Sequence, residues 1–253
     1  MTKTFQKDNL RVHQFATRSD MGAKAAENAA QEILELLRNK PKVVLMFASA
    51  PSQAEFLEGL AADKRIDWSR IVAVHLDEYM NFDPAAPQGF ARFLLDRIFL
   101  KVSPGECLLM QCGCTDTEQE RLRYEQVLQE NPIDIAFIGI GENGHIAFNE
   151  PKECNFNDPM LVREVTLDLK SRQQQVNDGC FKTLEEVPKT ALTATVPAIM
   201  GAKRILCMVP AASKAKAVYD ALNTDIGEHC PATVLRKHPN VDLYLDADSA
   251  ALL

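Results

Sequence analysis

Short apolar runs alternate with amphipathic segments along most of the chain, and this alternation constrains the fold more than any other feature. Runs of strand length occur at residues 42–48, 70–75, 107–110, 133–139, 204–209 and 241–246. Helical spacing occurs at 20–39, from about 52, and at 88–100, 115–129 and 212–223. The pattern predicts an α/β fold with a mostly parallel, doubly wound (Rossmann-like) sheet and helices on both faces. With no linker or repeat in view, we expect residues 1–253 to form one domain.

Composition argues against several classes of protein. The net charge of -7 over 253 residues disfavours binding to nucleic acid, since the basic residues are diluted among acids. No apolar run approaches the roughly 20 residues that cross a bilayer, and residues 1–18 lack the apolar core of a signal peptide. We therefore expect a cytoplasmic protein with no membrane partner.

Seven cysteines occur at irregular positions, and this odd number favours reduced thiols over a disulfide framework. Cys112 and Cys114 are separated by a single residue and have no second pair nearby in the sequence. That spacing is not typical of a redox or zinc motif, so we expect no metal site there.

In sheets of this kind, ligands bind where the carboxyl ends of the strands meet. The expected strand at 70–75 leads into Asp77 and Glu78, so one of these two carboxylates is expected to point into a site. In the alternative interpretation, the pair is a helix or turn cap and its solvated neighbour.

The stretch 139–151 follows another expected strand and is the most informative in the chain. It contains three glycines, His145 and Glu150, which together could perform acid–base chemistry: a carboxylate can hold an imidazole ring and raise the basicity of its other nitrogen. A purely structural histidine is the alternative. The glycines match the Gly-x-Gly-x-x-Gly spacing of dinucleotide sites, but Pro151 falls where the following helix should be established. We therefore expect no nicotinamide or flavin cofactor.

Residues 139–151 closely resemble the signature of the glucosamine-6-phosphate deaminase/isomerase family, which is related to 6-phosphogluconolactonase. The resemblance covers nearly the whole chain, through residues 76–79, 187–193, 213–215, 231–233 and 238–239, in the family's order. It implies an enzyme that converts an aminosugar 6-phosphate into a ketose phosphate and ammonia, by ring opening, proton transfer from C2 to C1 and loss of the amine. It implies neither a metal nor an organic cofactor.

The resemblance also implies roles for individual residues. Asp77 matches the carboxylate that transfers the proton, His145 the acid–base group that opens the ring, and Glu150 the partner of that histidine. Phosphate binding is implied for Ser49, Ala50 and Ser52 in the loop after the strand at 42–48, at the N-terminus of a helix. Arg172 and Lys214 would add positive charge, although surface solvation is the ordinary alternative for each of them.

The chain departs from the family pattern at several positions. Asn143, which we include in the expected catalytic set, stands where the family usually has Asp and can neither accept a proton nor carry charge. The expected effect is a weaker relay to His145 and a larger burden on Glu150. The phosphate loop lacks the usual Gly and Thr, and the residues around Arg172 differ from those around the family's arginine. The segment after Pro151 also differs from the family's allosteric segment, so that regulation is not inferred.

Two other functions compete with the deaminase. A 6-phosphogluconolactonase shares the fold and a similar loop, but that family continues from its histidine with Thr-Ala-Ser rather than the Ile-Ala-Phe that follows His145. A sugar-phosphate-binding protein without catalysis is suggested by Asn143. Its transcriptional form is disfavoured, because about 19 residues before the first expected helix are too few for a helix-turn-helix module. The sequence leaves open the gluco or galacto configuration of the aminosugar and the choice between monomer and homo-oligomer.

Overall fold

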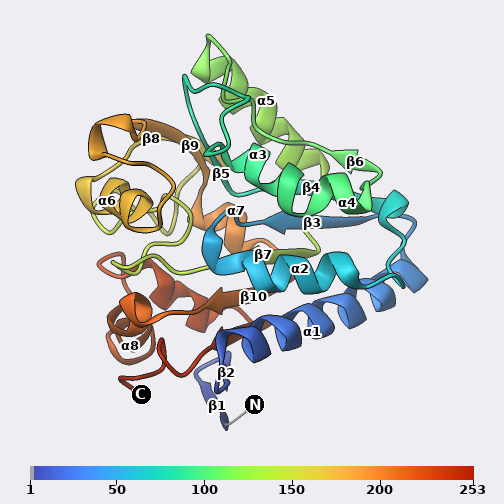
Figure 1. Cartoon of the computed structure of the whole chain (residues 1–253), viewed down its shortest axis with the longest axis vertical. Helices are drawn as coiled ribbons and strands as arrows, with labels where there is room; N and C mark the ends of the chain where they lie inside the picture. Colours follow the sequence, from blue (N-terminus) through green and yellow to red (C-terminus); the bar gives the residue numbers. More distant parts are fainter. Residues whose placement is uncertain (1–2) are drawn as a thin grey trace.

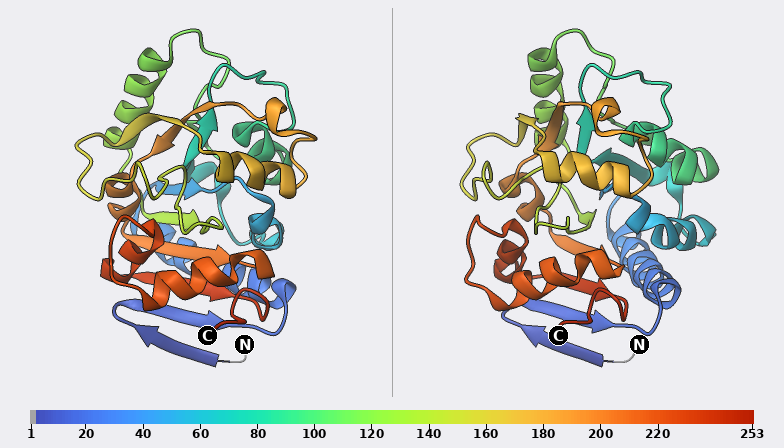
Figure 2. Two further views of the ribbon diagram at one scale, coloured as in Figure 1. Left: turned by 90° about the vertical axis from the view of Figure 1, so that its left-hand side faces the viewer. Right: turned by 60° about the vertical axis from the view of Figure 1, so that its left-hand side comes forward.

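An eight-stranded sheet forms the centre of the computed structural model, which describes residues 3–253 (Figures 1 and 2). Its strands lie in the order β1-β2-β11-β10-β7-β3-β4-β6. The strands are β1 Lys3–Lys7, β2 Leu10–Gln14, β3 Val43–Phe47, β4 Ile71–His75, β6 Glu106–Cys107, β7 Ile135–Ile138, β10 Arg204–Val209 and β11 Val241–Leu245. Only the pair β1 and β2 is antiparallel. The predicted α/β fold with a mostly parallel sheet is confirmed.

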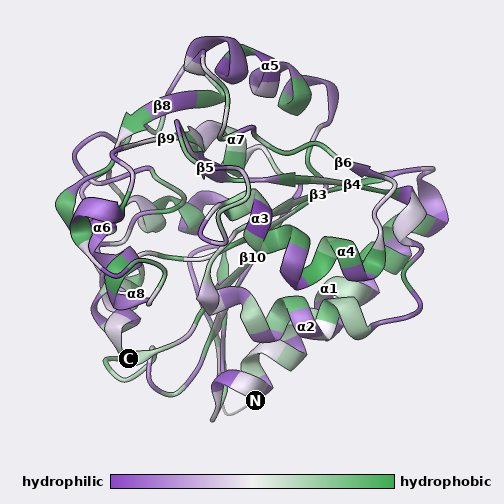
Figure 3. Ribbon diagram, turned by 45° about the horizontal axis from the view of Figure 1, so that its top comes forward, coloured by the Kyte–Doolittle hydropathy of each residue, from purple (hydrophilic) through white to green (hydrophobic). Residues whose placement is uncertain are grey.

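Helices cover both faces of this sheet, because successive strand residues point to opposite sides. Leu45 of β3 packs in a cluster with α1 (Arg18–Asn39) and α2 (Ala54–Ala62). Its neighbour Met46 packs in a second cluster with α5 (Thr117–Glu130), α7 (Val196–Met200) and α8 (Ala215–Asn223). Figure 3 shows β3 and β4 as hydrophobic ribbons inside and α5 as a largely hydrophilic helix at the surface.

A second sheet was not predicted and lies beyond the end of β4. It is antiparallel, in the order β5-β9-β8, with β5 at Asp77–Tyr79, β9 at Thr190–Ala194 and β8 at Val162–Thr166. The three-residue β5 and the polar β8 are too short or too mixed to stand out by periodicity. Four aromatic side chains pack against this sheet: Tyr79, Phe90, Phe148 and Phe181.

Leu76 joins the two sheets. Its backbone N–H donates to the carbonyl of Phe47 at the end of β3, at 3.1 Å, and its own carbonyl accepts from the N–H of Ala194 in β9, at 2.7 Å. The chain therefore leaves one ladder and enters the other within a single residue. This change of sheet fixes the position of Asp77, the next residue.

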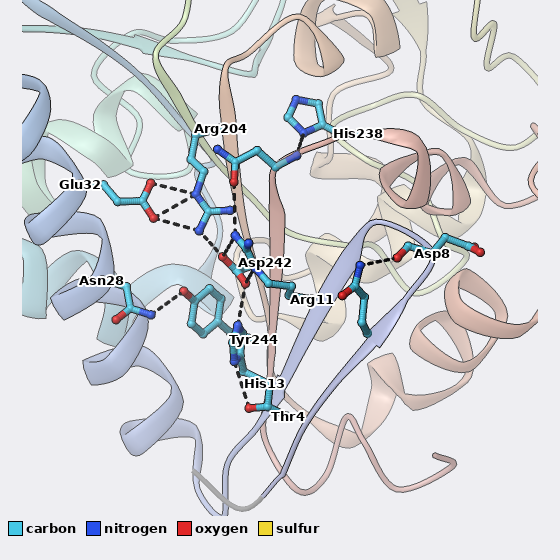
Figure 4. A network of polar contacts seen from close by, with 12 residues as sticks. Thr4, Asp8, Arg11, His13, Asn28, Glu32, Arg204, His238, Asp242 and Tyr244 are labelled. Atoms are coloured by element: carbon cyan, nitrogen blue, oxygen red, sulfur yellow. Dashed lines mark hydrogen bonds and ion pairs between the residues drawn. The ribbon is translucent and has the colours of Figure 1, made fainter.

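Two strands at the N-terminus, β1 and β2, were also missed, because their residues are polar and mixed in charge. Charged contacts hold β2 against β11 (Figure 4). Asp242 of β11 accepts from Arg11 Nε at 2.8 Å and from His13 Nε2 at 2.6 Å, and it also contacts Arg204. Arg204 in turn pairs with Glu32 of α1 at 2.8 Å. The sequence pattern does not predict this network, because its members are far apart in the sequence.

Several predicted boundaries need correction. The helix expected over residues 88–100 is interrupted: α3 (Phe90–Leu94) passes through a π-helical turn at Leu95–Phe99 into α4 (Leu100–Val102). The wider turn brings Ile98 and Phe99 into the core together. The strand expected at 107–110 is reduced to β6, and the polar helix α6 (Leu169–Asn177) was not predicted.

Short 3₁₀ turns precede two of the predicted helices. The turn η1 (Pro51–Gln53) comes before α2, and η5 (Ala212–Lys214) comes before α8. Among residues 3–253, no helix has both the length and the apolarity needed to cross a membrane. The organisation of residues 1–253 as one domain stays a prediction.

Replacing Asp242 by Asn is expected to lower the free energy of unfolding by about 3 kcal/mol at neutral pH, because it removes the buried charge that Arg11, His13 and Arg204 share. Burial opposes ionisation of Asp242, yet hydrogen bonds from His13, Arg11 and Arg204 hold its pKa below the ordinary value. This stabilisation is therefore present above the ordinary pKa, about 4, and is lost as the pH falls below it. Urea unfolding at pH 7 and pH 3 measures both effects.

Asp220→Asn is the matched control, since Asp220 pairs with Lys216 on the surface of α8. It should cost less than about 1 kcal/mol. Equal losses for the two variants at pH 7 would show that the Asp242 network does not hold the N-terminal strands.

Candidate active site

A cavity of about 140 Å³ lies where the carboxyl ends of the parallel strands meet, as predicted. Its walls come from residues 48–53 after β3, Leu76 and Asp77 after β4, residues 139–148 after β7 and residues 210–214 after β10. Helix α6 and the start of α1 complete them. Figure 1 shows α6 on the side of the sheet toward which β3 and β10 point. The cavity contains Asp77, His145, Ser49, Ala50, Ser52 and Lys214 from the predicted set.

Asp77 and Glu78 point to different places. Glu78 is fully buried and accepts hydrogen bonds from the backbone N–H groups of Tyr79, Phe90 and Ala91, at 2.9, 3.0 and 2.7 Å. It therefore caps the start of α3. Asp77 faces the cavity, where burial and then the nearby Glu78 raise its pKa to about 8. One of the two carboxylates thus lines the cavity, and neither of them is solvated.

The glycines of the loop after β7 allow His145 to fold back over the chain. A Cβ on Gly141 would lie 2.1 Å from atoms of the His145 ring, so any larger residue would push the ring away. Gly144 has φ +84°, and a Cβ there would lie 2.6 Å from Cys230 Sγ. Two cavity residues that are not glycine also have positive φ: Ala147 at +49° and Ala211 at +86°. Such strained backbone is concentrated at functional sites.

Asn143 connects His145 to Glu150. Its Oδ1 accepts from the backbone N–H of His145 at 3.1 Å and contacts the ring Nδ1 at 2.7 Å, while its Nδ2 donates to Glu150 Oε2 at 2.5 Å. Because the backbone N–H can only donate, Oδ1 must face His145, so ring Nδ1 carries the proton. Neutral His145 then has its lone pair on Nε2.

Glu150 is a buried carboxylate that also lies 3.3 Å from His145 Nδ1. Burial raises its pKa, but the charge and hydrogen bond of His145 and the hydrogen bonds of Ser171 and Asn143 lower it to about 2. His145 therefore keeps an ionised partner, and the neutral Asn143 bridges the two groups.

The loop after β3 offers unused donors to the cavity. The backbone N–H groups of Ser49 and Ala50 bind no acceptor among residues 3–253, and the buried Ser49 Oγ also has no hydrogen-bond partner there. Ser52 lies in η1, just before α2. Free donors of this kind suit an anion.

Lys214 is 6% exposed and lines the same cavity. Its ammonium forms no ion pair with any residue between 3 and 253, and burial lowers its pKa while Asp178 and Glu142 oppose that shift. A buried cation without a close partner is costly, so this arrangement suits an anionic ligand.

Arg172 does not line the cavity, contrary to its predicted role in phosphate binding. Its guanidinium turns to the other side of α6, where Nη2 donates to the carbonyls of Leu184 and Val187, the latter at 3.0 Å. Arg172 thus ties α6 to the segment 184–187. Its predicted role came from the family resemblance, which identifies the residue but does not fix the direction of its side chain in this chain.

The cavity, and the contacts of His145 and Glu150 beside it, also include residues that the sequence reasoning missed. Gln174, Gln175 and Asp178 come from α6 and its end, and Arg18 comes from the first residue of α1. Ser171 donates to Glu150 and lies 3.3 Å from His145 Nδ1. The helical spacing of 171, 174, 175 and 178 places these polar residues on one face and was a usable signal. Among residues 3–253, no three His, Cys, Asp or Glu side chains gather closely enough to hold a metal ion.

The fold and this cavity define an α/β protein that gathers a carboxylate, an imidazole and an unpaired lysine at the carboxyl edge of its sheet. A sequence model described as glucosamine-6-phosphate isomerases/6-phosphogluconolactonase matches residues 16–244. The chain belongs to this family.

Individual relatives agree with the assignment. Glucosamine-6-phosphate deaminases of Bacillus cereus (strain G9842) and Bacillus thuringiensis (strain Al Hakam) are each 35% identical over 227 residues, which is 90% of this chain and 84% of theirs. A solved monomeric glucosamine-6-phosphate deaminase, 31% identical, superposes with a TM-score of 0.88 over 96% of this chain and 99% of its own. A 6-phosphogluconolactonase from Shewanella baltica OS155 shares the fold at a TM-score of 0.78 and 18% identity, covering 93% and 97%.

Asn143→Leu is expected to change the tautomer of neutral His145, because leucine keeps the branching at Cγ but removes the acceptor that holds the proton on Nδ1. Nitrogen chemical shifts of the labelled ring at high pH report which nitrogen is protonated. The wild type should show the Nδ1–H form, and the variant should shift toward Nε2–H.

The control is Asn223→Leu, since Asn223 is exposed and donates only to the carbonyl of Tyr219. It should leave the His145 signals unchanged. An Nε2–H tautomer in the wild type would contradict the bridging arrangement of Asn143.

Proposed function

We propose that this protein is an aminosugar-6-phosphate deaminase/isomerase that converts glucosamine 6-phosphate, or its galacto epimer, into the ketose 6-phosphate and ammonia. One observation carries the proposal: a single cavity at the carboxyl edge contains the buried carboxylate Asp77, the oriented imidazole of His145 and the unpaired cation Lys214. Membership of the family and the deaminases among its relatives agree with this chemistry.

His145 opens the sugar ring in this proposal. Its Nε2 lone pair takes the proton from the O1 hydroxyl and returns a proton to the ring oxygen as the C1–O5 bond breaks. Glu150, ionised and in contact with the ring, stabilises the imidazolium that forms between the two steps. Asn143 and Ser171 position these two groups.

Asp77 then moves the proton between carbons. Its carboxylate removes the proton from C2 of the open chain and delivers it to C1. Over the same step O1 gains a proton and the amine nitrogen loses one, so the C1 aldehyde and C2 amine become a C1 alcohol and a C2 imine. Water adds to the imine, and ammonia leaves to give the ketone. A buried carboxylate with a raised pKa is a stronger base than an exposed one, as this step requires.

The phosphate is anchored at the other functional groups of the cavity. Lys214 supplies charge, and Ser49, Ala50 and Ser52 supply donors from the loop and the turn before α2. Binding at this anchor places C1 and C2 beside the reacting groups. The seven cysteines, all free in the structure, agree with a reaction in the reducing cytoplasm.

Ammonia release from glucosamine 6-phosphate and galactosamine 6-phosphate tests the proposed reaction, with 6-phosphogluconolactone hydrolysis measured beside it. We expect ammonia from at least one aminosugar and no lactone hydrolysis. Hydrolysis of the lactone without ammonia would assign a lactonase instead. Tight binding of the aminosugar phosphates with no turnover at any pH would indicate a binding protein.

Asp77→Asn should abolish both ammonia release and exchange of the C2 proton with deuterated solvent, because the amide cannot accept the proton. Binding of the phosphate ester should change little, since Lys214 and the loop after β3 remain. Asp96→Asn on the exposed π-helical turn is the control and should retain full activity. Undiminished C2 exchange in Asp77→Asn would exclude Asp77 as the base.

The pH dependence of kcat/KM should follow the ionisation of Asp77 in the free enzyme. Because its pKa is raised to about 8, most of the enzyme holds a protonated carboxyl at pH 6, and kcat/KM should rise with pH until about 8. Initial rates between pH 5.5 and 9 measure this limb. A kcat/KM that is constant between pH 6 and 8 would contradict the assignment of the base.

A further inference from the structure

The positive charge at the anion end of the cavity is incomplete without Arg18. Arg172, the expected second cation, binds two backbone carbonyls on the far side of α6. Lys214 remains, but the acidic side chain of Asp178 lines the same cavity and acts on it electrostatically. A phosphate ester carries close to two negative charges at neutral pH. One ammonium with a nearby carboxylate balances such a group poorly.

Arg18 lies beside the loop that offers the free donors. It is the first residue of α1, and its Nη2 donates to the carbonyl of Pro51 at 2.5 Å. Its Nε lies 2.7 Å from Glu55 Oε1 on α2. These two contacts hold the guanidinium at the edge of the cavity, which it lines together with Ser49 and Lys214. The charges of Arg18 and Lys214 both lower the pKa of Asp178, against the raising effect of burial, so the two cations act on one region of the cavity.

From this geometry we propose that Arg18 is a second cationic ligand, beside Lys214, for the phosphate of the substrate. A guanidinium has five donors in a planar fork, and the two contacts to Pro51 and Glu55 leave further N–H groups for phosphate oxygens. The phosphate then lies between α1, the loop after β3 and Lys214. This inference rests on the proposed function for the identity of the ligand.

Glu55 competes with the ligand for the same guanidinium. The side chains of Arg18 and Glu55 are 35% and 32% exposed, so the pair is partly solvated and a phosphate can share the arginine. Removing the charge of Glu55 should therefore strengthen phosphate binding. If Arg18 only fastened α1 to α2, removal of its carboxylate partner would not have that effect.

Calorimetric titration with fructose 6-phosphate, with fructose and with inorganic phosphate tests the proposal without relying on turnover. Arg18→Gln should weaken fructose 6-phosphate binding about 10- to 100-fold and leave any fructose binding unchanged. Arg18→Lys should lose less affinity, because it keeps the charge but not the fork. Glu55→Gln should bind the phosphate ester more tightly than the wild type.

Arg65→Gln is the matched control, because Arg65 is another exposed arginine paired with a carboxylate, Asp63, and lies outside the cavity. It should bind like the wild type. Thermal unfolding of each variant reports whether the fold is intact. If Arg18→Gln is unstable, the affinities of Arg18→Lys and Glu55→Gln for fructose 6-phosphate still test the role of Arg18.

Wild-type affinity in Arg18→Gln, with affinity lost in Lys214→Gln, would overturn the role of Arg18 and leave the anion site itself intact. Failure of the proposed function is a separate result: the protein would release no ammonia from any aminosugar phosphate, while its binding of fructose 6-phosphate still depended on Arg18. A wild type that bound neither fructose 6-phosphate nor inorganic phosphate would overturn the anion site together with Arg18.

Discussion

The change of sheet at Leu76 is the constraint on which the candidate site depends. This residue hydrogen-bonds to β3 through its N–H and to β9 through its carbonyl. Asp77 therefore starts a strand of the small sheet while it still lies at the carboxyl edge of the large one. The aromatic cluster around Tyr79 and Phe148 fills the space between the small sheet and the loop of His145. Asp77, from the small sheet, and His145, from the loop after β7 in the large sheet, therefore line the same cavity.

The large sheet was predictable from the sequence, and the small one was not. Strands such as β3 and β10 are buried on both faces, so they appear as continuous apolar runs. In contrast, β1 and β2 are polar and owe their place to the long-range contacts of Asp242, and β5 has three residues. Strands β2 and β5 pair with strands distant in sequence, β11 and β9, which no local pattern records, and β1 is added to the sheet only through β2.

The residues of the site also divide into those that the sequence predicted and those that only the structure shows. Asp77 and His145 were found because they follow predicted strands, whose ends fix their position, whereas Lys214 was implied by the family resemblance; all three line the cavity. Arg172 was placed wrongly, since one residue of rotation along α6 decides whether a side chain faces the cavity. Arg18 was missed because its loop contact, at Pro51, lies 33 residues along the chain. Asn143 was expected to weaken the relay, yet its amide satisfies both His145 and Glu150 through geometry that only the structure gives.

A crystal structure with the open-chain analogue 2-amino-2-deoxyglucitol 6-phosphate tests the central claim most directly, because this analogue has the substrate's skeleton but no reactive carbonyl. The account predicts its phosphate in contact with Ser49 and Lys214, its C1 and C2 beside the carboxylate of Asp77, and its O5 within hydrogen-bond distance of His145 Nε2. A phosphate bound elsewhere, or a C2 carbon on the side of the cavity away from Asp77, would contradict the account.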